Sequence, residues 1–158
     1  MKRIHFLLSA LLMVGCASQV FAQTFPCQNS LLPIDQRVKD SMDRMTTDEK
    51  IGQMMQVERS MVEPNPSILV SYNIGSVLSG GGSSPSAGNT FLAWANMVDT
   101  LQTYALKTRL NIPMIYGIDA LHGHNNVFGA TIFPHNIGAG CTRNPSEIHS
   151  LSTAAALR

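Results

Sequence analysis

One stretch decides the fold of this chain: Ile112-Pro-Met-Ile-Tyr-Gly-Ile-Asp119-Ala-Leu-His122-Gly123. An apolar run stops abruptly at the carboxylate of Asp119, and a His-Gly pair follows. Runs of this kind are typical of strands buried on both faces, as the parallel strands of α/β proteins are. The sequence therefore predicts a buried parallel strand with Asp119 at its carboxyl end, where α/β folds place their binding and catalytic groups. A second interpretation stays open, in which Asp119 only caps the start of a helix.

The residues before this stretch predict a strand–helix–strand unit. Residues 74–78 have the composition of a strand, and residues 90–109 carry apolar side chains at helical spacing. A strand, a helix and a second strand in this order imply parallel pairing of the strands. Trp94 lies on the apolar face of the predicted helix, and we interpret it as packed core and not as a platform for a sugar ring.

A loop rich in glycine and serine, residues 79–88, joins the first of these strands to the helix. Such a loop can cradle a phosphate, but this one has neither the dinucleotide fingerprint nor a P-loop lysine. We interpret it as a mobile loop at the rim of a site, where backbone can approach a ligand closely. Residues 122–136 form a second polar loop, and its length indicates a functional role.

Further helices are predicted on both sides of this unit. Residues 35–45 show an amphipathic pattern, and Thr46 and Glu49 form a capping box that begins the next helix. We expect the apolar face of that next helix to be core; it carries Ile51, Met54 and Met55. A last helix begins at Asn144-Pro145 and is still running at Arg158.

The N-terminus has the pattern of a bacterial secretory signal. A positively charged start precedes an apolar core at residues 4–14, and Val20-Phe21-Ala22 offers a small-residue cleavage site. We predict a signal peptide at residues 1–22 and a periplasmic or secreted mature chain. Residues 12–16 also fit a lipoprotein box, in which Cys16 would be lipidated and the chain anchored to the outer membrane.

Composition limits the partners of the mature chain. With 44% hydrophobic residues, 13% charged residues and a net charge of +1, the sequence is that of a globular protein without a basic patch. Nucleic-acid binding is therefore not predicted. Export permits a disulfide between Cys27 and Cys141, but two cysteines so far apart in sequence do not establish one, and two free thiols are an equal alternative.

Among the ten acidic residues, Asp119 is the one that we predict to end an apolar strand. The others fall on the polar faces or first turns of predicted helices, or near Pro64 and Pro66. His122, His124 and His135 suggest a zinc site, but the glycine between the first two and the asparagines after them indicate a loop, and no cysteine or glutamate completes a ligand set. We predict no metal, no cofactor and no serine or cysteine nucleophile.

Four ordered motifs resemble the N-terminal domain of glycoside hydrolase family 3, in its β-glucosidase and β-glucan exohydrolase branch. They are Met45-Thr-Thr-Asp-Glu-Lys-Ile-Gly-Gln-Met, Ile74-Gly-Ser-Val-Leu-Ser-Gly-Gly-Gly, Arg109-Leu-Asn-Ile-Pro-Met-Ile-Tyr-Gly-Ile-Asp-Ala-Leu-His-Gly and Gly129-Ala-Thr-Ile-Phe-Pro-His-Asn-Ile-Gly. The resemblance covers nearly all of the chain after the signal. It implies an α/β fold, the N-terminal portion of a (β/α)8 TIM-type barrel, over residues 23–158.

The resemblance also implies a function and a role for one residue. Family members are retaining enzymes that act on terminal β-D-glucosyl residues of β-glucosides and β-glucans, and the aspartate that matches Asp119 binds glucosyl hydroxyls. The family's nucleophile and acid/base lie beyond the position of Arg158, so no catalytic residue is assigned here. Because a barrel takes about 250 residues, we expect this chain to be an incomplete, inactive front portion of such an enzyme.

Two alternatives remain at this level. The chain could be a non-catalytic sugar-binding surface lipoprotein, or an inactive product of a truncated gene. Within the family, the β-N-acetylhexosaminidase branch is disfavoured, because the apolar Ala120-Leu121 stands where that branch has a more polar continuation.

Overall fold

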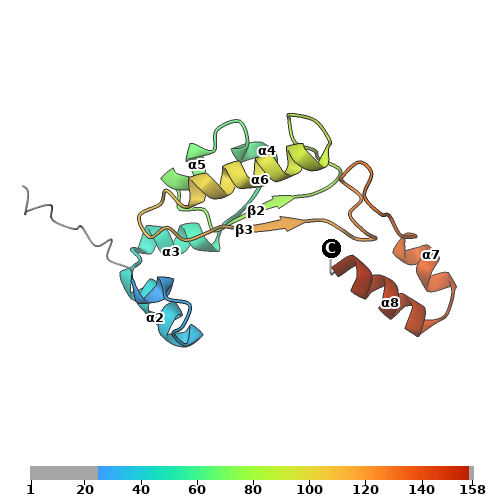
Figure 1. Cartoon of the computed structure of the whole chain (residues 1–158), viewed down its shortest axis with the longest axis horizontal. Helices are drawn as coiled ribbons and strands as arrows, with labels where there is room; N and C mark the ends of the chain where they lie inside the picture. The colour runs from blue at the N-terminus through green and yellow to red at the C-terminus, as the bar shows by residue number, and fades with distance from the viewer. Residues whose placement is uncertain (1–24, 157–158) are drawn as a thin grey trace, which may run out of the picture. The chain divides into compact units, whose positions relative to one another are not determined.

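The structure, a computed structural model, describes residues 25–156 (Figure 1). The predicted signal peptide at residues 1–22 and Cys16 lie outside this range. The described residues divide into two compact units, 25–41 and 42–156. In the first, a 3-10 helix, η1 (Pro26–Gln28), is tied to the start of α2 (Ile34–Arg44), a helix whose last residues belong to the second unit, by a hydrogen bond of 3.0 Å from the Arg37 guanidinium to the Cys27 carbonyl.

The second unit is built on a sheet of three parallel strands. These are β1 (Gln56–Glu58), β2 (Ser76–Ser79) and β3 (Ile115–Ile118), in the spatial order β1-β2-β3. In register, Val77 of β2 lies between Val57 and Tyr116. The strand–helix–strand unit predicted from the sequence is therefore confirmed, with each strand shorter than or shifted from its predicted range. A third strand, β1, was missed, because Val57 is its one apolar residue.

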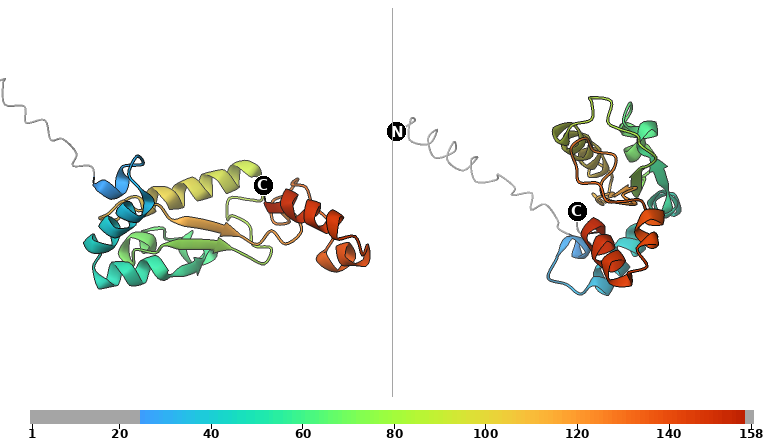
Figure 2. Two further views of the ribbon diagram at one scale, coloured as in Figure 1. Left: turned by 90° about the horizontal axis from the view of Figure 1, so that it is seen from below. Right: turned by 90° about the vertical axis from the view of Figure 1, so that its right-hand side faces the viewer.

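Helices connect the strands and flank them in sequence. The elements α4 (Arg59–Val62) and α5 (Ser67–Ser71) join β1 to β2, and α6 (Phe91–Ala105) joins β2 to β3 (Figures 1 and 2). The other helices of this unit are α3 (Thr47–Met54), α7 (Asn136–Cys141) and α8 (Pro145–Ala156). No described helix is both long and apolar enough to cross a membrane.

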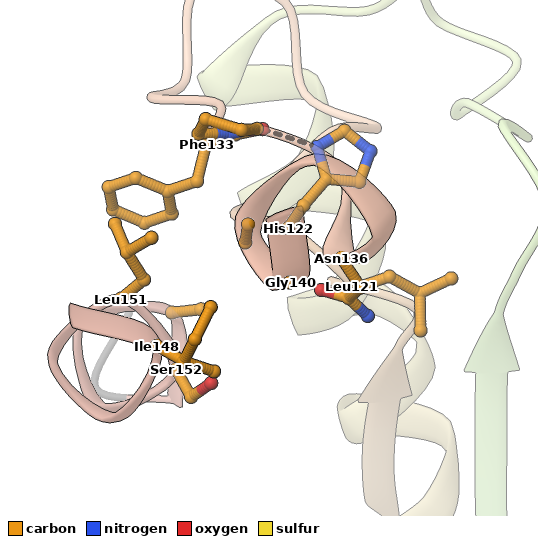
Figure 3. Close-up of a pocket in the computed structure, with 11 residues that line it drawn as sticks. Leu121, His122, Phe133, Asn136, Gly140, Ile148, Leu151 and Ser152 are labelled. Atoms are coloured by element: carbon orange, nitrogen blue, oxygen red, sulfur yellow. Dashed lines mark hydrogen bonds between the residues drawn. The ribbon is translucent and has the colours of Figure 1, made fainter. Parts of the chain in front are cut away.

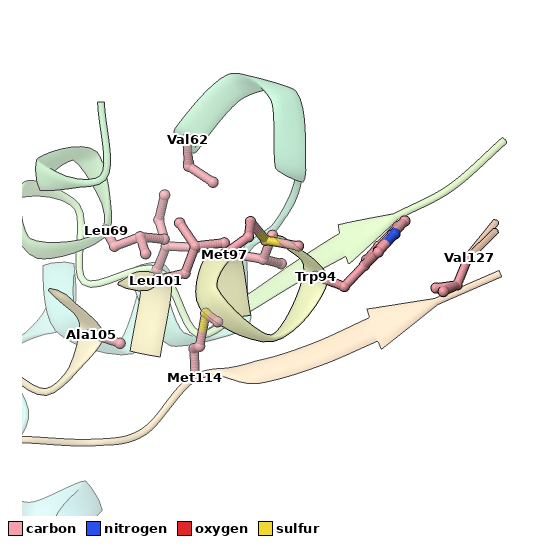
Figure 4. Close-up of a cluster of buried hydrophobic side chains, with 10 residues drawn as sticks. Val62, Leu69, Trp94, Met97, Leu101, Ala105, Met114 and Val127 are labelled. Atoms are coloured by element: carbon pink, nitrogen blue, oxygen red, sulfur yellow. The ribbon is translucent and has the colours of Figure 1, made fainter. Parts of the chain in front are cut away.

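The hydrophobic core lies between β2 and the helices α4, α5 and α6 (Figure 4). Val77 is completely buried there, as is Leu69 of α5. Trp94 is only 6% exposed, and its indole nitrogen donates to Asn89 Oδ1 at 2.8 Å, which satisfies the polar end of this buried ring. Its interpretation as packed core is confirmed.

The prediction that the strand before Asp119 is buried on both faces is wrong. Tyr116 and Ile118 pack on the core, but Ile115, which points to the opposite face, is 73% exposed. Side chains alternate across a strand, so burial on both faces needs a layer on each side of the sheet. Among the described residues, α4, α5 and α6 cover one face, and Ile115 on the other stays uncovered.

The prediction that the apolar face of α3 is core is also wrong. Ile51 is 54% exposed and Met54 is 87% exposed. The helix instead packs through Gly52, where an added Cβ would lie 2.1 Å from the carbonyl oxygen of Tyr72. Because the backbone of α3 approaches the backbone at Tyr72 this closely, the buried side of the helix is the one that carries Gly52.

The capping box predicted at the start of α3 is present and extends into a long-range ion pair. The Thr46 amide donates to Glu49 Oε2 at 2.8 Å, and the Glu49 amide donates to Thr46 Oγ1 at 3.2 Å. Arg109, 60 residues later, donates to both carboxylate oxygens of Glu49, at 2.9 and 2.6 Å. The hydrogen bonds from Arg109 and the Thr46 amide lower the pKa of Glu49 to about 2 from its ordinary 4.5.

Replacement of Glu49 by Gln should lower the melting temperature at neutral pH. A folded pKa below the ordinary value means that the ionised carboxylate stabilises the fold above pH 4.5, and that this contribution is lost as the pH falls from 4.5 towards 2. The difference in melting temperature between Glu49→Gln and the parent should shrink over this pH window. Glu147→Gln, at an exposed first-turn position of α8, is the control. A difference that stays constant from pH 7 to pH 2 would contradict this assignment.

Candidate functional site

The carboxyl ends of the three parallel strands bring Glu58, Ser79 and Asp119 to one edge of the sheet. Asp119 directly follows β3, and its amide donates to the Ser79 carbonyl at 3.1 Å, which continues the ladder between β2 and β3 by one residue. Its side chain is exposed. Asp119 does not begin a helix, since the next residues form turns and isolated bridges. The helix-cap interpretation is thereby excluded.

The carboxylate of Asp119 makes no hydrogen bond or ion pair within the described part of the chain. Its backbone is engaged at both polar atoms: besides the amide bond to Ser79, the carbonyl accepts from the Asn126 side-chain amide at 3.4 Å. An exposed carboxylate with both oxygens available can accept charge-assisted hydrogen bonds from two hydroxyl groups of one ligand. Such a group suits a ligand that carries neighbouring hydroxyl groups.

Glu58 also lies at this edge, but its carboxylate is already engaged. One oxygen accepts hydrogen bonds from the Ser60 amide at 2.6 Å and from the Ser60 hydroxyl, and the other accepts from the Ser83 hydroxyl at 3.3 Å. Burial acts to raise the pKa of Glu58, but the hydrogen bonds from Ser60 and the charge of Arg59 outweigh it, so the pKa is lowered. Sequence reasoning missed this residue, because β1 has no apolar alternation.

A second carboxylate, Glu63, holds the other end of the glycine- and serine-rich loop. Its Oε1 accepts from the Ser86 amide at 2.8 Å and from the Ser86 hydroxyl at 2.7 Å, and its Oε2 is paired with the buried Arg59. Burial acts to raise the pKa of Glu63, but the bonds from Ser86 and the charge of Arg59 lower it overall. The loop that the sequence suggested to be mobile is thus tied down at Ser83 and at Ser86.

A side-chain hydrogen bond also joins β2 and β3 near their carboxyl ends. The Tyr116 hydroxyl donates to Ser79 Oγ at 2.6 Å, and Ser79 is completely buried. Burial raises the pKa of Tyr116 above its ordinary value. The hydroxyl therefore stays protonated at neutral pH and links the side chains of β3 and β2 on the core face of the sheet.

The three histidines of the following loop do not converge on a common point. His122 Nδ1 lies 2.8 Å from the Phe133 carbonyl oxygen, which can only accept, so this nitrogen carries the proton and donates. The ring centroids of His122 and His135 lie 4.1 Å apart with the planes tilted by 41°, whereas His124 packs edge-on against Trp94 with the centroids 5.9 Å apart. Among residues 25–156 no three His, Cys, Asp or Glu side chains gather as metal ligands would. Cys27 and Cys141 are free thiols.

Two hollows lie beyond the end of β3. One, of about 320 Å³, is lined by His122 and Phe133 of the loop and by Ile148 and Leu151 of α8 (Figure 3). The other, of about 430 Å³, is lined by Ile118, Leu121, His124 and residues of α8. Neither is lined by Asp119, whose carboxylate stands on the open face of the sheet. We place the candidate site at Asp119, because its carboxylate is free to bind a ligand, and not in either hollow.

Comparison with known proteins identifies the family. Residues 46–157 match the model of the glycosyl hydrolase family 3 N terminal domain. The chain belongs to glycosyl hydrolase family 3. Its three strands, parallel and in consecutive order, are accordingly the N-terminal portion of a (β/α)8-type barrel, as the resemblance of its motifs to this family implied.

Relatives within family 3 are much longer than this chain. A lysosomal beta glucosidase of Dictyostelium discoideum is 38% identical over 136 residues, which cover 77% of this chain and 16% of that protein. The structure of an exo-1,3/1,4-beta-glucanase (ExoP) from a Pseudoalteromonas species matches with a TM-score of 0.62 and 34% identity, covering 70% of this chain and 14% of that one. A point mutant of that glucanase matches with a TM-score of 0.61 and 34% identity, covering 70% of this chain and 18% of that one.

Replacement of Glu63 by Gln should loosen the glycine- and serine-rich loop of this family 3 domain. A hydrogen bond to a charged acceptor is worth roughly 1 kcal/mol more than one to a neutral acceptor, so the Ser86 amide should exchange its hydrogen about fivefold faster. Hydrogen exchange followed by mass spectrometry measures this rate. Glu147→Gln, on α8, serves as the matched control. An unchanged rate at Ser86 would show that Glu63 does not hold the loop.

Proposed function

We propose that the protein is a retaining glycoside hydrolase that removes terminal β-D-glucosyl residues from β-glucosides or β-glucan oligosaccharides, and that Asp119 binds hydroxyl groups of the sugar. The observation that carries the proposal is the unengaged carboxylate of Asp119 at the carboxyl end of β3. Membership of family 3 and the relatives named as a beta glucosidase and a beta-glucanase support the reaction class.

The hydrogen bonds of the other carboxylates support a ligand-binding role for Asp119. Glu58 and Glu63 accept hydrogen bonds from the loop and from Arg59, and Glu49 is paired with Arg109. At the described edge of the sheet, Asp119 is left to receive hydroxyl groups of a ligand. A carboxylate that accepts two such bonds orients the ring and helps to hold it in a distorted conformation near the transition state.

Asp119 is assigned to binding and not to the chemical step. Retaining glycosidases use a nucleophilic carboxylate and a second carboxylic acid about 5 Å apart across the scissile bond. We assign neither role to a residue of this chain, and we propose that both are supplied by sequence beyond Arg158, so that these residues alone do not hydrolyse a glucoside. No cofactor is proposed, since acid–base and nucleophilic chemistry suffices for this reaction.

We further propose that the protein is exported, with residues 1–22 as its signal peptide. The charged start, the apolar core and the small-residue site before Gln23 support this proposal. Lipidation at Cys16 is the competing outcome. Mass spectrometry of the mature N-terminus distinguishes the two, because ordinary cleavage leaves a chain beginning at Gln23, and lipidation leaves one beginning at a modified Cys16.

Replacement of Asp119 by Asn tests the sugar-binding role in the protein expressed from its complete gene. Asn keeps one neutral acceptor, so the variant loses one charge-assisted hydrogen bond and the charge on the other; this should cost roughly 3 kcal/mol and lower kcat/KM for an aryl β-glucoside about a hundredfold. The melting temperature should change little, because the carboxylate is exposed and holds no part of the fold.

The matched control is Asp99→Asn, an exposed aspartate on α6. It should keep the parent's kcat/KM. Near-normal turnover by Asp119→Asn would refute the role of Asp119. A parent protein that binds glucosides but hydrolyses none would support the alternative of a non-catalytic sugar-binding protein.

A further inference from the structure

The carboxylate of Asp119 lies directly over the backbone of Gly80, the residue that follows β2. A Cβ atom added to Gly80 would lie 2.8 Å from Asp119 Oδ2 and 3.7 Å from its Cγ, and these are the nearest atoms to that position. Cβ atoms in proteins essentially never lie within 3.0 Å of a non-bonded heavy atom, so the contact with Oδ2 could not persist. A side chain of any kind at position 80 would therefore occupy the space that the carboxylate uses.

Gly80 differs in this respect from the other closely packed glycines of the unit. A Cβ on Gly52, Gly75 or Gly123 would lie between 2.1 and 2.4 Å from a backbone carbonyl oxygen, so these glycines allow one stretch of backbone to pack on another. At Gly80 the obstructing atoms belong to an exposed side chain. The requirement for glycine there concerns the position of a carboxylate, not the packing of the fold.

The hydrogen bonds around Gly80 and Asp119 indicate which of the two would move if a side chain were added at position 80. The backbone of Asp119 is fixed by its hydrogen bond to the Ser79 carbonyl, the peptide that leads into Gly80. The loop beyond Gly80 is held by Glu58 at Ser83 and by Glu63 at Ser86. By contrast, no described residue forms a hydrogen bond to the Asp119 carboxylate. The side chain, and not the backbone, is the part free to move.

We propose that Gly80 is a positioning residue for sugar binding: its missing side chain leaves open the space that the Asp119 carboxylate occupies, so that the carboxylate can take the position in which it binds the sugar. The inference rests on the proposed function of Asp119. It assigns to the first glycine of the loop a task different from that of Gly81 and Gly82, whose positive φ values of 57° and 80° and open surroundings serve the turn.

The test is Gly80→Ala in the protein expressed from its complete gene, with Gly81→Ala as the matched control. Gly80→Ala should keep the melting temperature of the parent and lower kcat/KM for an aryl β-glucoside about ten- to a hundredfold, the effect of a displaced binding group. Gly81→Ala strains the turn, but its added Cβ meets no atom within 4 Å. Its kcat/KM should therefore fall by less than about threefold. Equal losses from the two variants would overturn the proposal.

A double-mutant cycle with Asp119→Ala separates positioning from general damage to the loop. Once the carboxylate is removed, an alanine at position 80 has nothing to displace, so its further effect on kcat/KM should fall below about threefold. If the loss from Gly80→Ala is as large in the Asp119→Ala background as in the parent, the two residues act independently and the proposal is overturned.

A crystal structure of Gly80→Ala provides a readout that does not depend on activity. The Asp119 carboxylate should be rotated away from residue 80, with the loop backbone unmoved; a carboxylate in its original place would overturn the proposal. If the carboxylate is rotated in Gly80→Ala but kcat/KM is unchanged in Asp119→Ala, Asp119 does not bind the sugar. The proposed function of Asp119 is then overturned, and Gly80 has no effect on sugar binding. The two failures are therefore distinguishable.

Discussion

The parallel pairing of β2 with β1 and β3 is the constraint on which the candidate site depends. Parallel strands end at the same edge of a sheet, so pairing alone brings Glu58, Gly80 and Asp119 together although they are far apart in sequence. The ladder extends one residue past the strands, through the Asp119 amide and the Ser79 carbonyl. A shift of β3 by one residue would turn Asp119 to the opposite face and towards the core.

At the opposite, amino-terminal edge, close backbone contacts hold the sheet in place. The Gly75 amide donates to the Gly52 carbonyl at 3.0 Å, and the Ile115 amide donates to the Gly75 carbonyl at 2.9 Å. One line of backbone hydrogen bonds thus runs from α3 through the start of β2 to β3. Because glycines occupy both crossing points, helix and strand can approach without side chains between them. The register that positions Asp119 is fixed from this end.

The acidic residues differ in burial and in the hydrogen bonds that they accept. A buried carboxylate is costly unless it is paired or accepts hydrogen bonds. Glu49, Glu58 and Glu63 each accept several, and in each the hydrogen bonds and a nearby arginine outweigh the effect of burial, so that their pKa values are lowered. These three residues hold α3 and the loop in place. Asp119 is exposed and unpaired in the described chain, which leaves it available to a ligand.

The sequence alone determined the local features of this protein. The capping box at Thr46, the burial of Trp94 at helical spacing and the end of an apolar run at Asp119 all depend on residues close together in the chain, so pattern and propensity suffice to predict them. Motifs that resemble family 3 added the prediction of a barrel and the hypothesis that Asp119 binds a sugar. The exposure of Ile115, Met54 and Ile51 was not predicted, because an apolar pattern does not say whether a second layer covers it.

Only the tertiary structure decided which residues meet across the chain. Nothing near Glu49 in sequence points to Arg109, and nothing near Gly80 points to the carboxylate that lies over it, since both contacts form between segments brought together by strand pairing. The strand β1 is too short and too polar to be recognised by its pattern, and its pairing with β2 defines it. The sequence predicted that Asp119 ends the strand, because that depends on neighbouring residues. The space around its carboxylate and the hydrogen bonds that hold the loop at residues 79–88 depend on segments that only folding brings together.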